Sequence, residues 1–237
     1  MAAVDAMTPL LETRGLSRSF GGLKAVRDVD FRLHKGEVRA VIGPNGAGKT
    51  TFVSLVSGRI RPSSGLVFFE GEDVSQLPDF KRVRRGIAYT FQITSIYGNL
   101  SAEENVALAA HQPGRSGSIA HLARVGLADR AAQIAGTLSY GHQRLLEVAM
   151  GLALKPKLLI LDEPTQGLSD AEIEGFIALV REVAKEATVL LIEHNMAVVM
   201  ELAHRITVLD RGSILAEGSP AEIRANAAVQ SAYLGTA

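Results

Sequence analysis

Gly43-Pro44-Asn45-Gly46-Ala47-Gly48-Lys49-Thr50 is the stretch that decides the fold. It matches the pattern G-x-x-x-x-G-K-[ST], follows the mainly apolar strand-like run Val38–Ile42 and precedes a helix-forming run at residues 51–57. A strand, a glycine-rich turn and a helix in this order predict a phosphate-binding loop. The glycines let successive backbone N–H groups face an anion, and the helix N-terminus adds partial positive charge. A chance glycine-rich turn or another P-loop enzyme, such as a nucleoside kinase, is the alternative at this point.

The chemistry of nucleotide hydrolysis assigns roles within this loop. Lys49 reaches the β- and γ-phosphates, and the hydroxyl of Thr50 is a ligand for Mg²⁺. Thr51, the next residue, completes the predicted nucleotide-binding set.

A second pattern, at residues 158–163, is an apolar run that ends in two carboxylates, Asp162 and Glu163. It predicts a buried strand that delivers both acids to the carboxyl edge of a sheet, where α/β proteins bind their ligands. Asp162 is placed to hold Mg²⁺, and Glu163 to polarise the attacking water as general base. The simpler interpretation is a strand end followed by a polar turn.

Short apolar runs alternate with helix-length segments along the rest of the chain, at residues 38–42, 158–162, 188–193 and 206–210. This alternation predicts βαβ units around a mostly parallel sheet. Strand-like runs at residues 10–33 and 66–70 predict an antiparallel β lobe. Residues 91–155 are rich in alanine and poor in strand signals, so we predict an α-helical subdomain inserted there, within one domain of residues 1–237.

Composition narrows the classes of function. Lys plus Arg and Asp plus Glu number 25 each, so no overall field attracts nucleic acid, and we expect no nucleic-acid partner. The basic cluster Lys81, Arg82, Arg84 and Arg85 is interpreted as a solvated helix face. There is no cysteine, and we see neither an export signal nor an apolar run of the ~20 residues that a transmembrane helix requires.

Between the two patterns lies Leu138-Ser139-Tyr140-Gly141-His142-Gln143, and here the chain resembles the ABC ATPase family, whose signature is Leu-Ser-Gly-Gly-Gln. Ser139 and Gly141 open a predicted helix, which forms a second anion-binding end. The resemblance implies a P-loop NTPase fold, MgATP as cofactor, and a signature of Ser139, Gly141 and His142 that acts on the nucleotide of an opposite subunit.

The resemblance also assigns three residues outside these motifs. It implies that Gln92 contacts metal and water and senses the membrane partner, that His194 contacts the γ-phosphate, and that Phe20 stacks on adenine. Taken alone, the three have ordinary explanations: a polar turn, a helix start and a core aromatic. The chain departs from the family pattern at Tyr140, at His142 and at Ser169. With Glu172, Ser169 is also placed to form a helix-capping box.

Within the family, the chain is most similar to the LivG-type ATPase subunits of branched-chain amino acid importers. The segments that carry this likeness are residues 19–26, 90–92, 138–143, 191–194 and 232–235. It implies a second ATPase subunit, identical or paralogous, permease subunits, a periplasmic solute-binding protein further along, and a place on the cytoplasmic face of the membrane. The alternatives are importers of other solutes, the ATPase of lipopolysaccharide export, a soluble scaffold or repair protein, and a small-molecule phosphotransferase.

Overall fold

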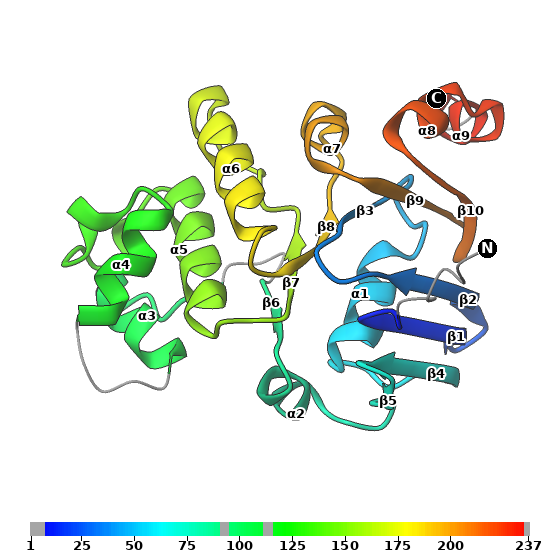
Figure 1. Ribbon diagram of the computed structural model, residues 1–237, viewed down its shortest axis with the longest axis horizontal. Helices are drawn as coiled ribbons and strands as arrows, with labels where there is room; N and C mark the ends of the chain where they lie inside the picture. The colour runs from blue at the N-terminus through cyan, green and yellow to red at the C-terminus, as the bar shows by residue number, and fades with distance from the viewer. Residues whose placement is uncertain (1–7, 91–94, 111–115, 235–237) are drawn as a thin grey trace, which may run out of the picture. The chain divides into compact units, whose positions relative to one another are not determined.

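The computed structural model describes residues 8–90, 95–110 and 116–234. The chain divides into two compact units: Met1–Arg82 with His204–Ala237, and Val83–Ala203. Each unit has its own strands and helices (Figure 1) and is described by itself. Among the helices of the described residues, none combines the length and apolar character needed to cross a bilayer.

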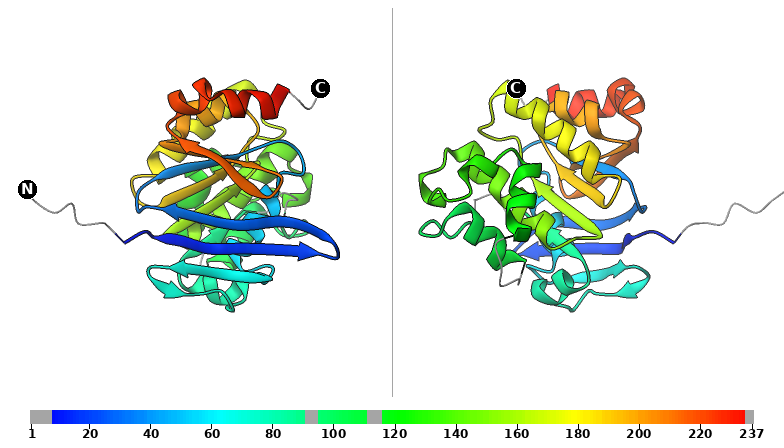
Figure 2. Two further views of the ribbon diagram at one scale, coloured as in Figure 1. Left: turned by 90° about the vertical axis from the view of Figure 1, so that its right-hand side faces the viewer. Right: turned by 60° about the vertical axis from the view of Figure 1, so that its left-hand side comes forward.

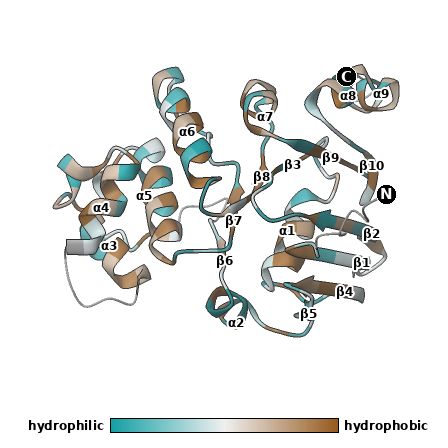
Figure 3. Ribbon diagram, in the orientation of Figure 1, coloured by the Kyte–Doolittle hydropathy of each residue, from teal (hydrophilic) through white to brown (hydrophobic). Residues whose placement is uncertain are grey.

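The first unit contains the predicted antiparallel lobe. Its strands are β1 (Leu11–Phe20), β2 (Leu23–Leu33), β4 (Ser64–Phe69) and β5 (Glu72–Asp73), in the order β2-β1-β4-β5. The long hairpin of β1 and β2 turns at Gly21, which has a φ of 56°, a left-handed value that glycine adopts freely. The two strands run side by side as blue ribbons in Figure 2, and Figure 3 shows the hydrophobic character of β4.

Three further strands of this unit carry the first motif. β3 (Val38–Ile42) pairs in parallel with β9 (Arg205–Asp210), and β10 (Ser213–Gly218) pairs antiparallel with β9. β3 has the predicted bounds, and α1 (Lys49–Ser57) covers the predicted helix-forming run. β3 is buried along its whole length and is apolar except at Arg39, which pairs with Glu37. Phe52 of α1 packs edge-on against Phe31 of β2, with 5.2 Å between ring centroids, which anchors the helix on the lobe. α8 (Pro220–Ala225) and α9 (Ala227–Leu234) complete the unit.

The predicted solvated basic cluster is wrong at one position. The cluster lies on α2 (Asp79–Arg84) and on the residue that follows it. Three of its side chains are exposed, those of Lys81, Arg84 and Arg85, but Arg82 is fully buried. Its guanidinium donates hydrogen bonds to four carbonyl oxygens, of Leu55, Val56, Ser75 and Leu77. Two of these carbonyls end α1, where a helix has unpaired acceptors and partial negative charge, and this explains why a cation is retained inside.

The second unit is built on a parallel sheet with the order β6 (Ile87–Tyr89), β7 (Leu158–Asp162) and β8 (Thr188–Ile192). α6 (Asp170–Val183) and α7 (Met196–Leu202) follow β7 and β8. β7 has the predicted bounds, while β8 stops one residue before Glu193.

Helices α3 (Ala102–Ala109), α4 (Ser116–Arg124) and α5 (Tyr140–Ala153) contact one another, with short 3-10 turns at Ala128–Arg130 and Ala135–Thr137. The three lie together in green in Figure 1. The capping box predicted for Ser169 with Glu172 is confirmed, and Ser101 with Glu104 forms another at the start of α3. The boundaries 91–155 for an inserted subdomain stay a prediction.

Candidate nucleotide site

The glycine-rich loop of the first unit is shaped by close backbone packing. Gly43 has a φ of 152°, and a Cβ there would lie 2.1 Å from the carbonyl oxygen of Leu209. Gly48, the N-cap of α1, has a φ of 100°, and its Cβ would lie 2.4 Å from the carbonyl oxygen of Ala25. Both positions therefore require glycine, and the loop is held against the strands behind it.

The ammonium group of Lys49 is hydrogen-bonded to the first two residues of the loop. Nζ of Lys49 donates to the carbonyl oxygens of Gly43, at 2.7 Å, and Pro44, at 3.1 Å. Asn45, Gly46 and Thr50 are exposed, so backbone N–H groups and a hydroxyl face the surface beside the ammonium. The loop thus has the donors, the helix N-terminus and the charge that a polyphosphate requires. The lobe's Phe20 is 45% exposed, with the guanidinium carbon of Arg18 4.6 Å from its ring centroid.

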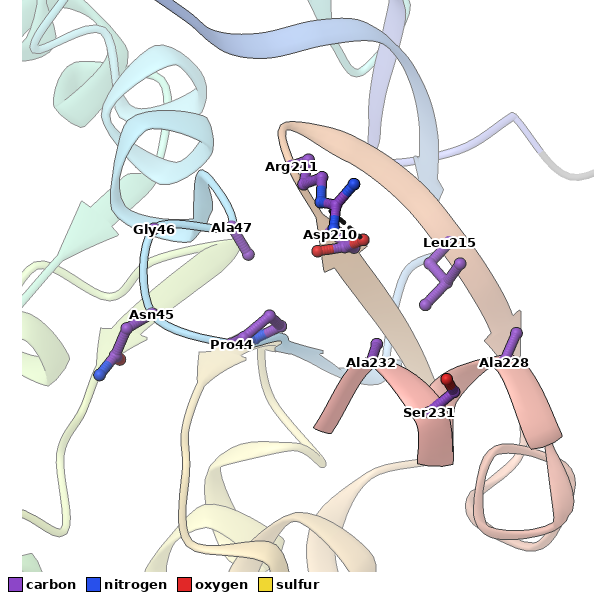
Figure 4. Close-up of a pocket in the computed structure, with 10 residues that line it drawn as sticks. All are labelled: Pro44, Asn45, Gly46, Ala47, Asp210, Arg211, Leu215, Ala228, Ser231 and Ala232. Atoms are coloured by element: carbon purple, nitrogen blue, oxygen red, sulfur yellow. Dashed lines mark ion pairs between the residues drawn. The ribbon is translucent and has the colours of Figure 1, made fainter. Parts of the chain in front are cut away.

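A pocket of about 550 Å³ adjoins the same loop. Figure 4 shows the loop from Pro44 to Ala47 on one side and Ser231 and Ala232 of α9 on another. Asp210, the last residue of β9, and Arg211, in the turn after it, also line the pocket. None of Phe20, Lys49 and Thr50 lines it. The backbone N–H of Gly43 also donates a hydrogen bond to the hydroxyl of Tyr233. This bond alone would lower the pKa of the phenol, but the larger effect of burial raises it. The C-terminal helix is therefore attached to the first residue of the loop.

The acidic strand end lies in the second unit. Asp162 is buried at the end of β7, and its Oδ2 accepts a hydrogen bond of 2.7 Å from the hydroxyl of Tyr89. Glu163 has a φ of 50°, an unfavourable left-handed value for a residue with a side chain. Its N–H donates to the carbonyl oxygen of Ile192 at 2.9 Å. Strain of this kind is found at sites where the direction of a side chain matters more than local stability.

His194 lies beside Glu163. Nδ1 of the imidazole is 4.0 Å from Oε1 of the carboxylate, and the histidine side chain is 64% exposed. Sequence reasoning proposed these two residues separately, and the structure brings them together. Gln92, the third predicted catalytic residue, lies outside the described residues.

The helix that follows the signature begins where the sequence predicts. Ser139 is the N-cap of α5, and its hydroxyl accepts from the N–H of His142 at 3.2 Å. Gly141 is buried, and a Cβ there would lie 2.9 Å from Cδ2 of Leu168. Two of the departures from the family pattern also contact the 166–172 segment. Tyr140 packs over Gly167, and His142 pairs with Glu172.

Sequence reasoning missed two residues of the second unit, Tyr89 and Glu193. Glu193 is 1% exposed and directly follows β8, which is the same signal that identified Asp162 and Glu163. Tyr89 carries no such signal, because it meets Asp162 only through the pairing of β6 with β7.

Comparison with known proteins shows which family has these sequence motifs and this fold. Residues 26–166 match the family model described as ABC transporter, and residues 213–237 match one described as branched-chain amino acid ATP-binding cassette transporter. The chain is 38% identical to the high-affinity branched-chain amino acid transport ATP-binding protein BraF of Pseudomonas aeruginosa and 36% identical to LivG of Escherichia coli. Each match covers 97% of this chain and 99% of the relative.

Solved structures agree on the fold. A nucleotide-free ATP-binding cassette from an ABC transporter superposes with a TM-score of 0.88 at 26% identity, covering 95% of this chain and 98% of the other. A cassette in its ADP conformation gives 0.86 at 27% identity, covering 96% and 99%. The fold is therefore that of the P-loop NTPase cassettes, with a mostly parallel sheet and an antiparallel lobe, as the sequence predicted.

Proposed function

Because the chain belongs to the ABC transporter ATPases, we propose that it is the ATP-hydrolysing subunit of an importer for branched-chain amino acids or related small polar solutes. One observation carries the solute class: residues 213–237 match a model specific to branched-chain amino acid cassettes, in addition to the near full-length likeness to BraF and LivG. That match favours this importer over lipopolysaccharide export, a soluble scaffold or a small-molecule phosphotransferase.

The first unit binds the nucleotide in this proposal. The backbone N–H groups of residues 43–48 and the ammonium of Lys49 hold the phosphate chain, helped by the N-terminus of α1. Thr51 lies in the same first turn of the helix, and Phe20 offers an exposed ring for the adenine to stack on.

The donor types at the predicted ligand positions suit a Mg²⁺ ion. This ion is held in proteins by one or two carboxylates together with substrate phosphates and water. The described residues hold no cluster of three or more His, Cys, Asp or Glu side chains that could hold a metal ion. Thr50 and Asp162 would supply a hydroxyl and a carboxylate, both hard oxygen donors, with Gln92 as the third predicted ligand. When bound, the ion neutralises charge on the phosphates.

Hydrolysis needs a base for the attacking water and a group that stabilises charge on the γ-phosphate. Glu163 is the base, and the strained backbone at this residue directs its carboxylate. His194, 4.0 Å away, is exposed enough to donate a hydrogen bond to the phosphate. Gln92 takes part in orienting the water.

The signature residues act on a second subunit in this proposal. Ser139, Gly141 and His142 lie at the N-terminal end of α5, where the partial positive charge of the helix favours an anion. The partner is a second ATPase subunit, identical or paralogous. The pair works on the cytoplasmic face of the membrane with permease subunits, which receive solute from a periplasmic binding protein.

The test is Glu163→Gln, which removes the base but keeps the size of the side chain. Turnover should fall by about 10²-fold or more, while ATP affinity is retained. Light scattering should show an ATP-dependent increase in mass as subunits pair. Ser139→Arg is the matched variant, which should bind ATP but fail to pair. Near-normal turnover of Glu163→Gln would contradict the assignment.

A further inference from the structure

Glu193 is a buried carboxylate to which the mechanism above gives no role. It follows β8 directly and is 1% exposed. Oε1 accepts from the N–H of Thr165 at 3.0 Å and also from its hydroxyl. Oε2 accepts from the N–H groups of His194 and Asn195, each at 3.0 Å. Four donors therefore converge on one side chain.

These four bonds join two loops that are far apart in sequence. Thr165 lies two residues after Glu163, in the turn that leaves β7. His194 and Asn195 form the turn that leaves β8, and Asn195 goes on to cap α7 through the N–H groups of Ala197 and Val198. A further connection between the same loops is the hydrogen bond from the N–H of Glu163 to the carbonyl oxygen of Ile192. The loop with Glu163 and the loop with His194 are thus attached to one carboxylate.

The chemistry of this position specifically calls for a carboxylate. An ionised carboxylate only accepts hydrogen bonds, and its two oxygens match four donors. A glutamine of the same shape has only one accepting oxygen. Its NH₂ group would replace the other oxygen of Glu193 and would then face two hydrogen-bond donors instead of accepting from them. Because Glu193 and Thr165 are both buried, a mismatch between them leaves a polar atom without a partner.

We propose that Glu193 is a positioning residue for ATP hydrolysis: it sets the spacing of Glu163 and His194 by fixing both of their loops. This inference rests on the proposed roles of those two residues. Their side chains are 4.0 Å apart, and His194 is largely exposed, so little besides its backbone holds it in place. Misplacement of a reacting group by about 1 Å can lower a rate about 10²-fold, whereas the affinity for nucleotide depends on other contacts.

The experiment compares four variants of the full chain with wild type, measuring kcat, KM for MgATP, ATP affinity by calorimetry and melting temperature. Glu193→Gln should lower kcat by about tenfold or more with ATP affinity within about threefold of wild type. Thr165→Val keeps the shape and the backbone N–H but removes one donor, so its loss of kcat should be smaller. Thr165→Ser, which restores the hydroxyl, and Glu174→Gln, on the exposed face of α6, should match wild type.

The outcomes separate a positioning role from a purely structural one. Normal kcat in a folded Glu193→Gln variant overturns the proposal, as does a change confined to ATP affinity. If Glu193→Gln does not fold, Thr165→Val against Thr165→Ser decides, and equal kcat values for that pair overturn it. Glu163→Gln is assayed in parallel. Lost turnover in Glu163→Gln with normal turnover in Glu193→Gln rejects the positioning role alone, and normal turnover in Glu163→Gln rejects both.

Discussion

Nε2 of His142 lies 3.4 Å from Oε1 of Glu172, so the signature helix α5 and the first turn of α6 meet at an imidazole and a carboxylate. Glu172 also forms the capping box with Ser169. Two positions at which the chain departs from the ABC pattern, His142 and Ser169, therefore share one carboxylate. The two departures are structurally linked, because His142 and Ser169 both contact the side chain of Glu172.

Glu172 should make stability depend on pH. Its pKa is lowered, first by the backbone N–H of Ser169 and then by the serine hydroxyl, so the unfolded chain binds the proton more tightly than the folded protein. The stabilisation is complete above the unfolded value, near 4.5, and is lost as the pH falls through the lowered pKa. Glu172→Gln, which keeps a neutral cap, should be less stable than wild type by up to about 1 kcal/mol at neutral pH and equal to it in acid.

Denaturant unfolding at a series of pH values measures this difference. The other capping boxes, Ser101 with Glu104 and Ser219 with Glu222, are shared by both proteins and cancel in the comparison. Glu174→Gln serves as the exposed control. A gap between wild type and Glu172→Gln that stays constant with pH would contradict the role of the ionised cap.

Lys49→Ala should weaken ATP binding by at least about tenfold, because it removes a cation that no neighbour of equal reach replaces. It also removes the two hydrogen bonds to Gly43 and Pro44 that close the loop. Calorimetry with MgATP measures the loss. Lys35→Ala, an exposed lysine in the turn before β3, is the control and should bind as wild type does. Equal ATP affinities of the two variants would show that Lys49 does not bind the phosphates.

Arg82→Met should destabilise the protein by about 3 kcal/mol or more, because four carbonyl oxygens, three of them in buried hydrogen bonds, lose their donor. Burial lowers the pKa of this guanidinium to about 10, but the group stays charged at neutral pH. Urea unfolding gives the free energy, and Arg85→Met, at an exposed position beside it, should change it little. Similar values for the two variants would show that the internal bonds of Arg82 contribute no net stability.

The parallel strands were the most predictable part of the fold. β3 and β7 have the predicted bounds because each is a mainly aliphatic run buried from end to end. Arg39 is the charged residue within β3, and Asp162 is the last residue of β7. The motif positions followed from the same strands, since the glycine-rich loop and the two acids lie at strand ends.

Contacts between distant residues could not be predicted. Arg82 has the sequence context of a surface helix, and only the meeting of α2 with the end of α1 explains its burial. Glu193 and Thr165 are 28 positions apart, and Tyr89 and Asp162 are 73 apart. A single sequence carries no information on such pairs, because either partner alone has an ordinary explanation as a turn or core residue.

The last prediction concerns the segment from Gln92 to Glu104, which we interpret as the contact with the permease. Its apolar residues differ in exposure: Ile96 and Leu100 are half-buried, and Tyr97 is 57% exposed. The backbone of this segment at Tyr97 is held by Asn105, a fully buried residue of α3. The Asn105 side chain accepts from the N–H of Tyr97 at 2.7 Å and donates to its carbonyl oxygen at 3.1 Å.

Ser95, in the described part of this segment, is attached to the signature helix as well. Glu147 of α5 is buried and accepts a hydrogen bond of 2.5 Å from the N–H of Ser95. A contact at Tyr97 is thus connected through Ser95 to the helix that begins at Ser139. An exposed aromatic ring on a loop fixed by buried polar bonds is suited to binding a partner, because it needs little ordering when the partner arrives.

Ile96→Glu and Tyr97→Glu should therefore release the chain from detergent-solubilised permease while its melting temperature and ATP affinity stay near those of wild type. The added charge must be buried without a partner if the permease is to remain bound, and this is costly. Leu23→Glu places the same charge at an apolar side chain that is 67% exposed on β2, and it should remain associated. Pull-down, a melting curve and a nucleotide titration are run on each variant. Retained association of both loop variants, or release only together with unfolding, would show that the segment packs within the subunit and that the permease is bound elsewhere.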